Sequence, residues 1–330
     1  MTVSIRNGDR RLSLLSMAQL RAWLARTYGE GEAWRLELAV SIGKRGRKRF
    51  VYRLCSNRHD DIALKAHRDP IRNAREFRAL HRLADADAPS LRPYFLAWDM
   101  SFYAMDWVAA PTLRDVLGGS DRHLWLERAG AWLAKLHHTS SHKRLVEARL
   151  LPLHLNRKAL DKTDAEATAK MKSRLASVDL KQGPRSIIHG DLHAKNLFAL
   201  PDQIVGYDRE TDGFGLTFLD VAALLADVSK SRFDAIRFYA PWDGNETEDR
   251  EAFFRGYGPI EAPHLQLFDT IEDALVFRKW RQQVRAGEAD ITDRVLERGL
   301  VGDGNALPHP GRLVRRVDGS VSWDTARAFA

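Results

Sequence analysis

The sequence predicts a two-lobed α+β fold, with a small strand-rich lobe at the N-terminus and a larger, mainly helical lobe after it. The chain has 330 residues, more than a single hydrophobic core usually holds, and 44% of them are hydrophobic. Segments typical of strands are concentrated near the start of the chain, and helical segments prevail later. We therefore expect an N-terminal lobe over residues 1–105, a connecting segment over 106–110 and a C-terminal lobe over 111–330.

The N-terminal lobe is expected to begin with an additional helix and to continue with strands around one further helix. The first helix should lie around residues 17–26. Phe77, Leu80 and Leu83 recur at helical spacing, which predicts the second helix over 73–83. The expected strands cover residues 34–43, 48–55, 61–65, 95–100 and 102–108.

The C-terminal lobe is expected to be helical, with a few short strands. The first helix should begin at Pro111 or Thr112, because proline and threonine are both common at helix starts. Further helices are expected at 129–137, 145–155, 158–180, from 220, from 253 and at 273–285. Short strands are expected at 185–188, 197–198 and 204–208, and a small hairpin around Asp318-Gly319.

Composition narrows the class of protein. The single cysteine, Cys55, excludes an internal disulfide, which fits a reducing cytoplasm. The N-terminus lacks the pattern of a signal peptide, and no run of about 18 apolar residues is present. The chain carries 52 Lys and Arg against 44 Asp and Glu. The basic run 44–49 is either a solvated surface or an anion-binding patch, and binding of nucleic acid is the less favoured reading.

The most informative segment is His189-Gly-Asp-Leu-His-Ala-Lys-Asn196, which fits the spacing His-x-Asp-x-x-x-x-Asn. Phosphoryl transfer requires an acceptor hydroxyl held in line, a group that accepts its proton, and metal ions on the phosphate oxygens. Asp191 is suited to the hydroxyl, and the side-chain oxygen of Asn196 is suited to Mg²⁺. Apolar runs on both sides of the loop predict short strands that hold it.

A second carboxylate follows at the end of the next predicted strand. The apolar run 204–207 ends at Asp208, twelve residues after Asn196. Because Mg²⁺ binds few carboxylates together with phosphate oxygens, Asp208 is the preferred second ligand and Asp212 its main rival. The alternative is that Asp208 is only a turn residue. Asp220 precedes an apolar helix that it could cap.

His-Gly-Asp-Leu-His-x-x-Asn followed by apolar residues resembles the aminoglycoside phosphotransferase and choline kinase family, the small-molecule branch of the protein-kinase-like fold. The resemblance implies a bilobal kinase fold, Asp191 as the catalytic residue, Asn196 and Asp208 as Mg²⁺ ligands, and ATP or GTP as phosphoryl donor. It also implies that Asp220 braces the catalytic loop. Protein kinases usually have arginine where Gly190 stands.

The resemblance extends upstream to the phosphate-binding residues. Asp61-Ile-Ala-Leu-Lys65 is similar to the kinase strand whose lysine contacts the α- and β-phosphates, and Glu76 on the next helix would be the partner of that lysine. Without the resemblance, Lys65 would be the solvated end of a strand and Glu76 a surface charge. His193 stands where protein kinases have a lysine that faces the γ-phosphate, which implies a lesser phosphate or loop-packing role.

Two further nucleotide contacts follow from the resemblance. Gly43 and Gly46 would let backbone amides approach the phosphates, although an ordinary hairpin turn explains them equally well. The segment 106–110 would be the hinge, in which Asp106 and Val108 present backbone groups to the adenine.

These residues predict an ATP- and Mg²⁺-dependent phosphotransferase acting on a hydroxyl of a small molecule, such as a sugar, a sugar acid, an amino alcohol or a related metabolite. Eleven residues (209–219) separate Asp208 from Asp220, too few for a long activation segment, which disfavours a protein acceptor. The formal charge of +8 favours a neutral or anionic acceptor. The alternatives are a kinase of a protein or of a lipid-linked sugar, and a non-catalytic binding protein with a kinase-like fold.

Overall fold

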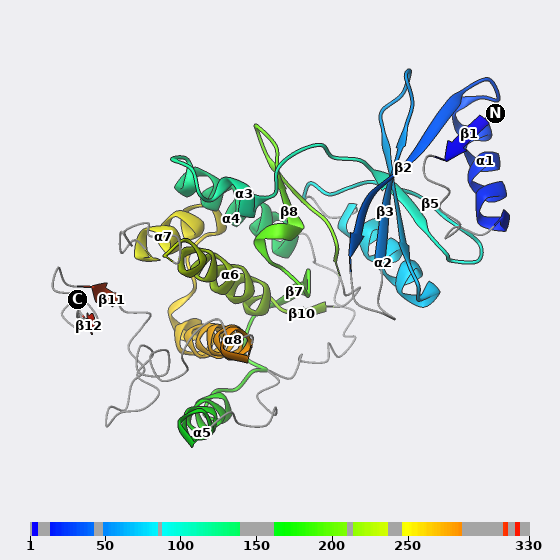
Figure 1. Ribbon diagram of the computed structural model, residues 1–330. Coiled ribbons are helices and arrows are strands. Elements are labelled where there is room, and N and C mark those ends of the chain that lie inside the picture. Colours follow the sequence, from blue (N-terminus) through cyan, green and yellow to red (C-terminus); the bar gives the residue numbers. More distant parts are fainter. Residues whose placement is uncertain are drawn as a thin grey trace. The chain divides into compact units, whose positions relative to one another are not determined.

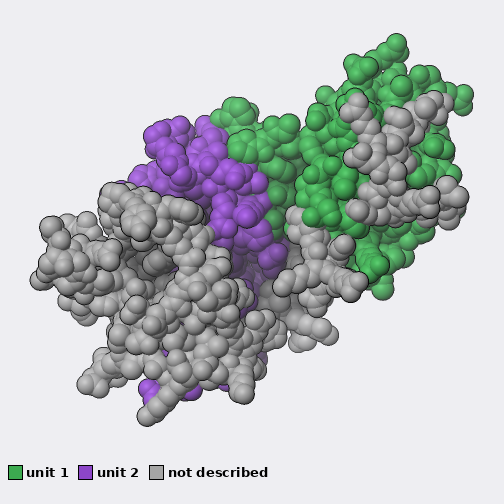
Figure 2. All heavy atoms as spheres, in the orientation of Figure 1, with its two compact units in different colours: residues 1–111, 196–212 green, residues 112–195, 213–330 purple. Residues whose placement is uncertain are grey.

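The protein divides into two compact units (Figure 2). A computed structural model describes residues 2–5, 14–42, 49–84, 88–138, 162–209, 214–236, 246–285, 313–315 and 321–323. Unit 1 consists of residues 1–111 and 196–212, and unit 2 of residues 112–195 and 213–330. The two units are defined by the contacts within each of them. The lobe boundaries expected at residues 105 and 111 stay a prediction.

Unit 1 is built on a six-stranded sheet (Figure 1). The strand order is β1-β2-β3-β4-β6-β5; β1 and β2 are parallel, and all other neighbours are antiparallel. The strands are β1 (Thr2–Ile5), β2 (Ala33–Ile42), β3 (Arg49–Cys55), β4 (Ile62–His67), β5 (Pro93–Leu96) and β6 (Tyr103–Asp106). The expected strands are thus present, although β5 ends earlier than predicted.

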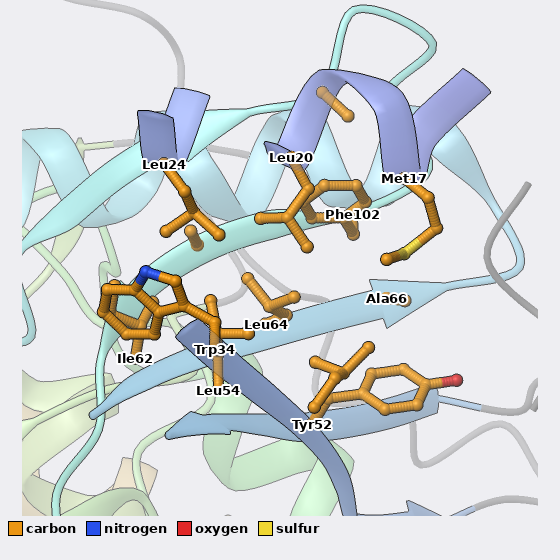
Figure 3. Close-up of a cluster of buried hydrophobic side chains, with 13 residues drawn as sticks. Met17, Leu20, Leu24, Trp34, Tyr52, Leu54, Ile62, Leu64, Ala66 and Phe102 are labelled. Atoms are coloured by element: carbon orange, nitrogen blue, oxygen red, sulfur yellow. The ribbon is translucent and has the colours of Figure 1, made fainter. Parts of the chain in front are cut away.

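One face of this sheet is covered by helix α1 (Leu14–Tyr28), the predicted N-terminal helix. Met17, Leu20 and Leu24 of α1 form a buried cluster with apolar side chains of the strands (Figure 3). Strand β4 contributes Ile62 and Leu64 to this cluster. Because side chains alternate along a strand, the residues between them point to the opposite face.

The opposite face carries helix α2 (Pro70–Ala84) and a short hairpin formed by β8 (Leu197–Ala199) and β9 (Ile204–Gly206). Leu80 of α2 and Val205 of β9 belong to one buried cluster with apolar residues of β4 and β6. This packing explains why residues 196–212 belong to unit 1, although the residues directly before them, up to Lys195, belong to unit 2. The face therefore brings α2, β4 and the end of β9 together.

Unit 2 is mainly helical. Its helices are α3 (Leu113–Val116), α4 (Arg122–His138), α5 (Lys162–Ala176), α6 (Phe218–Ile236), α7 (Glu246–Tyr257) and α8 (Leu265–Arg285), with a short 3-10 helix at Ala262–His264. Its strands pair as β7 (Arg185–Ile187) with β10 (Phe214–Leu216), and β11 (Leu313–Arg315) with β12 (Val321–Trp323). The second pair is the hairpin predicted around Asp318-Gly319. The predicted helix 145–155 lies outside the described residues.

Two glycines allow helices α4 and α7 to pack closely. A Cβ atom at Gly256 would lie 1.8 Å from the carbonyl oxygen of Glu127, and one at Gly130 would lie 2.1 Å from that of Phe253. Any larger residue would force the backbones of the two helices apart. In the described part of the chain, no helix is long and apolar enough to cross a membrane.

Candidate active site

Lys65 lies at the centre of a buried charge cluster in unit 1. The alternation of β4 directs its side chain to the face that α2 covers, and the side chain is only 4% exposed. Its Nζ atom lies 2.8 Å from Oε2 of Glu76 and 2.5 Å from Oδ1 of Asp208. The reading of Lys65 as a solvated strand end is therefore wrong, as is that of Glu76 as a surface charge.

Glu76 accepts hydrogen bonds from three other residues as well. His67 Nε2 lies 2.8 Å from Oε2, the Tyr103 hydroxyl donates to the same oxygen over 3.0 Å, and Arg72 Nε donates to Oε1 over 2.9 Å. Burial alone would raise the pKa of Glu76, but the hydrogen bond from His67 and the charge of Lys65 outweigh it and hold the pKa below its usual value. Glu76 is thus a carboxylate at neutral pH.

Asp208 follows β9 with a backbone φ of +57°, in the left-handed region that aspartate tolerates better than most residues. The ring of Tyr207 stacks on that of Phe198, with centroids 4.4 Å apart, and fixes the end of the hairpin. Burial and the nearby charge of Glu76 raise the pKa of Asp208, yet the charge and hydrogen bond of Lys65 together with the charge of Arg49 outweigh them, so that the pKa is lowered. The side chain is therefore ionised and oriented.

Asn196 is buried beside the same hairpin, and its backbone carbonyl oxygen accepts the backbone N–H of Tyr207 over 3.0 Å. One amide oxygen and one ionised carboxylate are hard oxygen ligands of the kind that Mg²⁺ shares with phosphate groups. The chemistry of Asn196 and Asp208 therefore fits this ion. The rival ligand Asp212 lies outside the described residues, and the described part contains no cluster of three or more His, Cys, Asp or Glu suited to a metal.

Asp191 belongs to the loop that precedes Asn196, in unit 2. Gly190 adopts a φ of +85°, a conformation that residues with a Cβ rarely take, which explains glycine at this position. The Asp191 side chain is 51% exposed, and His193 Nε2 lies 3.9 Å from its Oδ2 atom. Asp191 is thus accessible to a ligand from solvent.

Asp220 holds the start of this loop. Its carboxylate accepts the backbone N–H groups of His189 over 2.5 Å and of Gly190 over 3.0 Å, and it lies 3.3 Å from Nε2 of His137. Burial raises the pKa of Asp220, but the hydrogen bond and charge of His137, the charge of His189 and the backbone N–H of Gly190 together outweigh it, so that the pKa is lowered. Helix α6 begins at Phe218, so the helix-capping role considered for Asp220 is wrong and its carboxylate braces the loop instead.

Asp227 holds the other end of the loop and was missed in the sequence. Its carboxylate accepts the backbone N–H of Ala194 over 2.9 Å, and the side chain is buried. Asp220 and Asp227 are seven residues apart, so they lie on one side of α6. Two aspartates at this spacing within an apolar helix are the signal that could have identified Asp227.

The remaining predicted nucleotide contacts lie elsewhere in unit 1. Asp106 ends β6, where its N–H donates to the carbonyl oxygen of Arg92 and its carboxylate accepts the backbone N–H of Arg92 over 2.7 Å. Val108 is partly buried and packs against the apolar cluster on the α2 side of the sheet. Gly43 and Gly46 lie outside the described residues. Their roles in binding a nucleotide stay predictions.

The sequence profile of the phosphotransferase enzyme family (APH) matches residues 39–268 of this chain. This range contains both the charge cluster around Lys65 and the loop around Asp191. No curated protein matches the chain by sequence.

Solved structures share the fold at low sequence identity. Amicoumacin kinase, in complex with AMP-PNP, Ca²⁺ and Ami, has a TM-score of 0.56 and 13% identity over 77% of this chain and 82% of its own. A choline/ethanolamine kinase family protein from Mesorhizobium loti has a TM-score of 0.52 and 17% identity, covering 84% and 90%. An aminoglycoside-3'-phosphotransferase of type VIII has a TM-score of 0.52 and 16% identity, covering 80% and 100%.

These likenesses support the bilobal, protein-kinase-like α+β fold that the sequence predicts. The family profile spans more than half of the chain and includes the motif His-x-Asp-x-x-x-x-Asn. The chain therefore belongs to the phosphotransferase enzyme family and is a kinase with an alcohol group as acceptor.

Proposed function

We propose that this kinase transfers the terminal phosphoryl group of ATP, with Mg²⁺, to a hydroxyl of a small metabolite. The observation that carries the proposal is the buried chain Glu76–Lys65–Asp208, in which one lysine joins two ionised carboxylates. Such an arrangement fixes the position of the Lys65 ammonium group, which could then bind phosphate oxygens of a nucleotide. The complex of amicoumacin kinase with AMP-PNP supports an adenine nucleotide as donor.

In the proposed reaction, Asp191 orients the acceptor hydroxyl and accepts its proton. An exposed carboxylate on a loop whose backbone is held at both ends suits this task, since general-base catalysis depends on geometry before pKa. Lys65 would contact the α- and β-phosphates, and Asn196 and Asp208 would hold Mg²⁺, which supplies positive charge to the phosphate oxygens. His193, which is part of the same loop, would have a lesser role, either in the packing of the loop or in contact with a phosphate.

The test is substitution of Asp191 by asparagine, which keeps the size of the side chain and removes the base. We expect Asp191→Asn to lower kcat by about 10²–10⁴-fold, the usual cost of losing a general base, and to leave the affinity for Mg-AMP-PNP unchanged. Asp202→Asn, an exposed aspartate in the β8–β9 turn, is the matched control. A variant at 191 that keeps most of the wild-type kcat would exclude this role of Asp191.

We further propose that the acceptor is neutral or anionic, such as a sugar, a sugar acid or a phosphorylated metabolite. The formal charge of +8 opposes the capture of a polycation, because like charges repel the ligand and slow its association. The test compares aminoglycosides and choline with a panel of sugars and sugar acids in steady-state assays. A kcat/KM above about 10⁴ M⁻¹s⁻¹ for any aminoglycoside contradicts the proposal.

A further inference from the structure

Arg49 is a second cation on the carboxylate of Asp208. It is the first residue of β3, and its Nη1 atom lies 2.7 Å from Oδ2 of Asp208. Lys65 binds the other oxygen of the same carboxylate. Both oxygens of one buried aspartate are therefore bound by different cationic side chains.

Arg49 reaches Asp208 from the same face of the sheet as Lys65. Val51, two residues further along β3, belongs to the apolar cluster on the α2 side, whereas Tyr52 belongs to the cluster under α1. Since alternate residues of a strand share a face, Arg49 points to the α2 side as well. The register of the sheet thus places this guanidinium beside the predicted phosphate-binding lysine.

The two cations differ in how firmly they are held. The Lys65 side chain is 4% exposed and has Glu76 as a second partner at 2.8 Å. The Arg49 side chain is 32% exposed and stands at the end of its strand. A divalent cation on Asp208 would be repelled by the two cationic side chains that now bind its oxygens, so its binding favours the release of one of them. Arg49 is the partner that can be released at the smaller cost, because its partly exposed guanidinium can be solvated after it leaves the carboxylate, whereas the ammonium group of Lys65 is buried.

A guanidinium released from Asp208 remains a donor suited to phosphate. Its planar set of N–H groups binds two oxygens of a phosphate at once, which the ammonium group of a lysine does less well. The anion that arrives together with the divalent cation is, under the proposed function, the terminal phosphate of the nucleotide.

We propose that Arg49 exchanges its guanidinium between two anions, the carboxylate of Asp208 and the terminal phosphate of the nucleotide. It thereby competes with a lone divalent cation for Asp208 and favours the binding of metal and nucleotide together. The inference rests on the proposed function and goes beyond it by giving a residue outside the kinase motifs a part in nucleotide binding.

The test uses the full chain and calorimetry rather than turnover. We expect Arg49→Gln to bind Mn²⁺ alone about tenfold more tightly, because the competing ion pair with Asp208 is lost. We expect the same variant to bind Mg-AMP-PNP about 10- to 100-fold more weakly, the effect of losing a hydrogen bond between charged groups. Affinity for Mg-ADP, which lacks the terminal phosphate, should change less than affinity for Mg-AMP-PNP.

Two further variants make the result specific. Arg58→Gln removes an exposed arginine of the same unit that pairs with Glu32 over 3.1 Å, and it should leave all three affinities unchanged. Arg49→Lys keeps the charge but not the planar donor set. It should therefore still compete with Mn²⁺ while binding Mg-AMP-PNP more weakly than the wild type.

The proposal is overturned if Arg49→Gln binds both Mn²⁺ and Mg-AMP-PNP within twofold of the wild type. It is also overturned if only one of the two affinities changes, because one guanidinium shared between two anions has to affect both. Asp208→Asn separates this failure from that of the proposed function. A wild-type chain that binds no Mg-AMP-PNP refutes both, whereas binding that Asp208→Asn abolishes and Arg49→Gln leaves intact refutes the role of Arg49 alone.

Discussion

The buried carboxylates around Lys65 and those that hold the loop 189–194 are bound by different kinds of donor. In unit 1, Asp208 and Glu76 are bound mainly by cationic side chains, with Lys65 shared between them. In unit 2, Asp220 and Asp227 accept backbone N–H groups of the loop 189–194, and His137 supports Asp220.

The difference indicates separate tasks for the two centres. A side-chain cation can turn from a carboxylate to a phosphate, so the centre in unit 1 is suited to an exchange of partners with a ligand. A backbone N–H cannot move without moving the chain, so the centre in unit 2 is suited to fixing the loop that carries Asp191. Substitutions should accordingly alter binding in unit 1 and stability in unit 2.

The largest effect on stability is expected for Asp220→Ala. The substitution leaves the N–H groups of His189 and Gly190 and the ring of His137 without their buried acceptor. Removing one partner of a buried ionic network typically costs about 3–5 kcal/mol. Urea titration should show this loss in the free energy of unfolding.

Asp202→Ala, at an exposed turn, provides the control for Asp220→Ala and should cost less than about 0.5 kcal/mol. A loss at Asp220 below about 1 kcal/mol would mean that the loop is held by other contacts. The proposed contrast between the two units would then be wrong.

A smaller effect is expected on acidification. The pKa values of Asp220 and Glu76 are lowered in the folded state, so each contributes stability above its unfolded pKa of about 3.9 or 4.3. This contribution is lost as the pH falls below those values toward the folded pKa. Each tenfold difference in proton affinity between the folded and unfolded carboxyl group corresponds to about 1.4 kcal/mol. Thermal unfolding between pH 6 and pH 2.5 should therefore show a Tm that decreases below about pH 4.

Asp220→Asn sharpens this measurement, because it removes one of the two titrating groups. The decrease of Tm below about pH 4 should be shallower in the variant than in the wild type. Equal slopes would show that Asp220 does not carry the acid sensitivity of unit 2.

The smallest effect is expected for Tyr103→Phe, which removes a neutral donor from Glu76. Lys65, His67 and Arg72 still bind that carboxylate, so the cost should be about 1 kcal/mol. Affinity for Mg-AMP-PNP should stay within about threefold of the wild type. A tenfold loss would show that the orientation of Glu76 depends on this hydroxyl rather than on the cations.

Much of the fold and the core of the candidate site could be predicted from the sequence. The apolar strand before Lys65, the helical spacing of Phe77, Leu80 and Leu83, and the motif around Asp191 are all local patterns. Their meaning depends on neighbours within one strand, one helix or one loop. For the same reason the end of a strand at Asp208 was recognised without knowledge of its partners.

The sequence by itself determined which residues are candidates for the chemistry, and the tertiary structure decided what holds them. Arg49 and Asp208 are 159 residues apart, and His67 and Tyr103 meet at Glu76 only because β4, β6 and α2 pack on one face. Asp227 reaches Ala194 across 33 residues through the course of α6. Such contacts depend on strand register and helix packing, which bring together residues that no short sequence pattern relates.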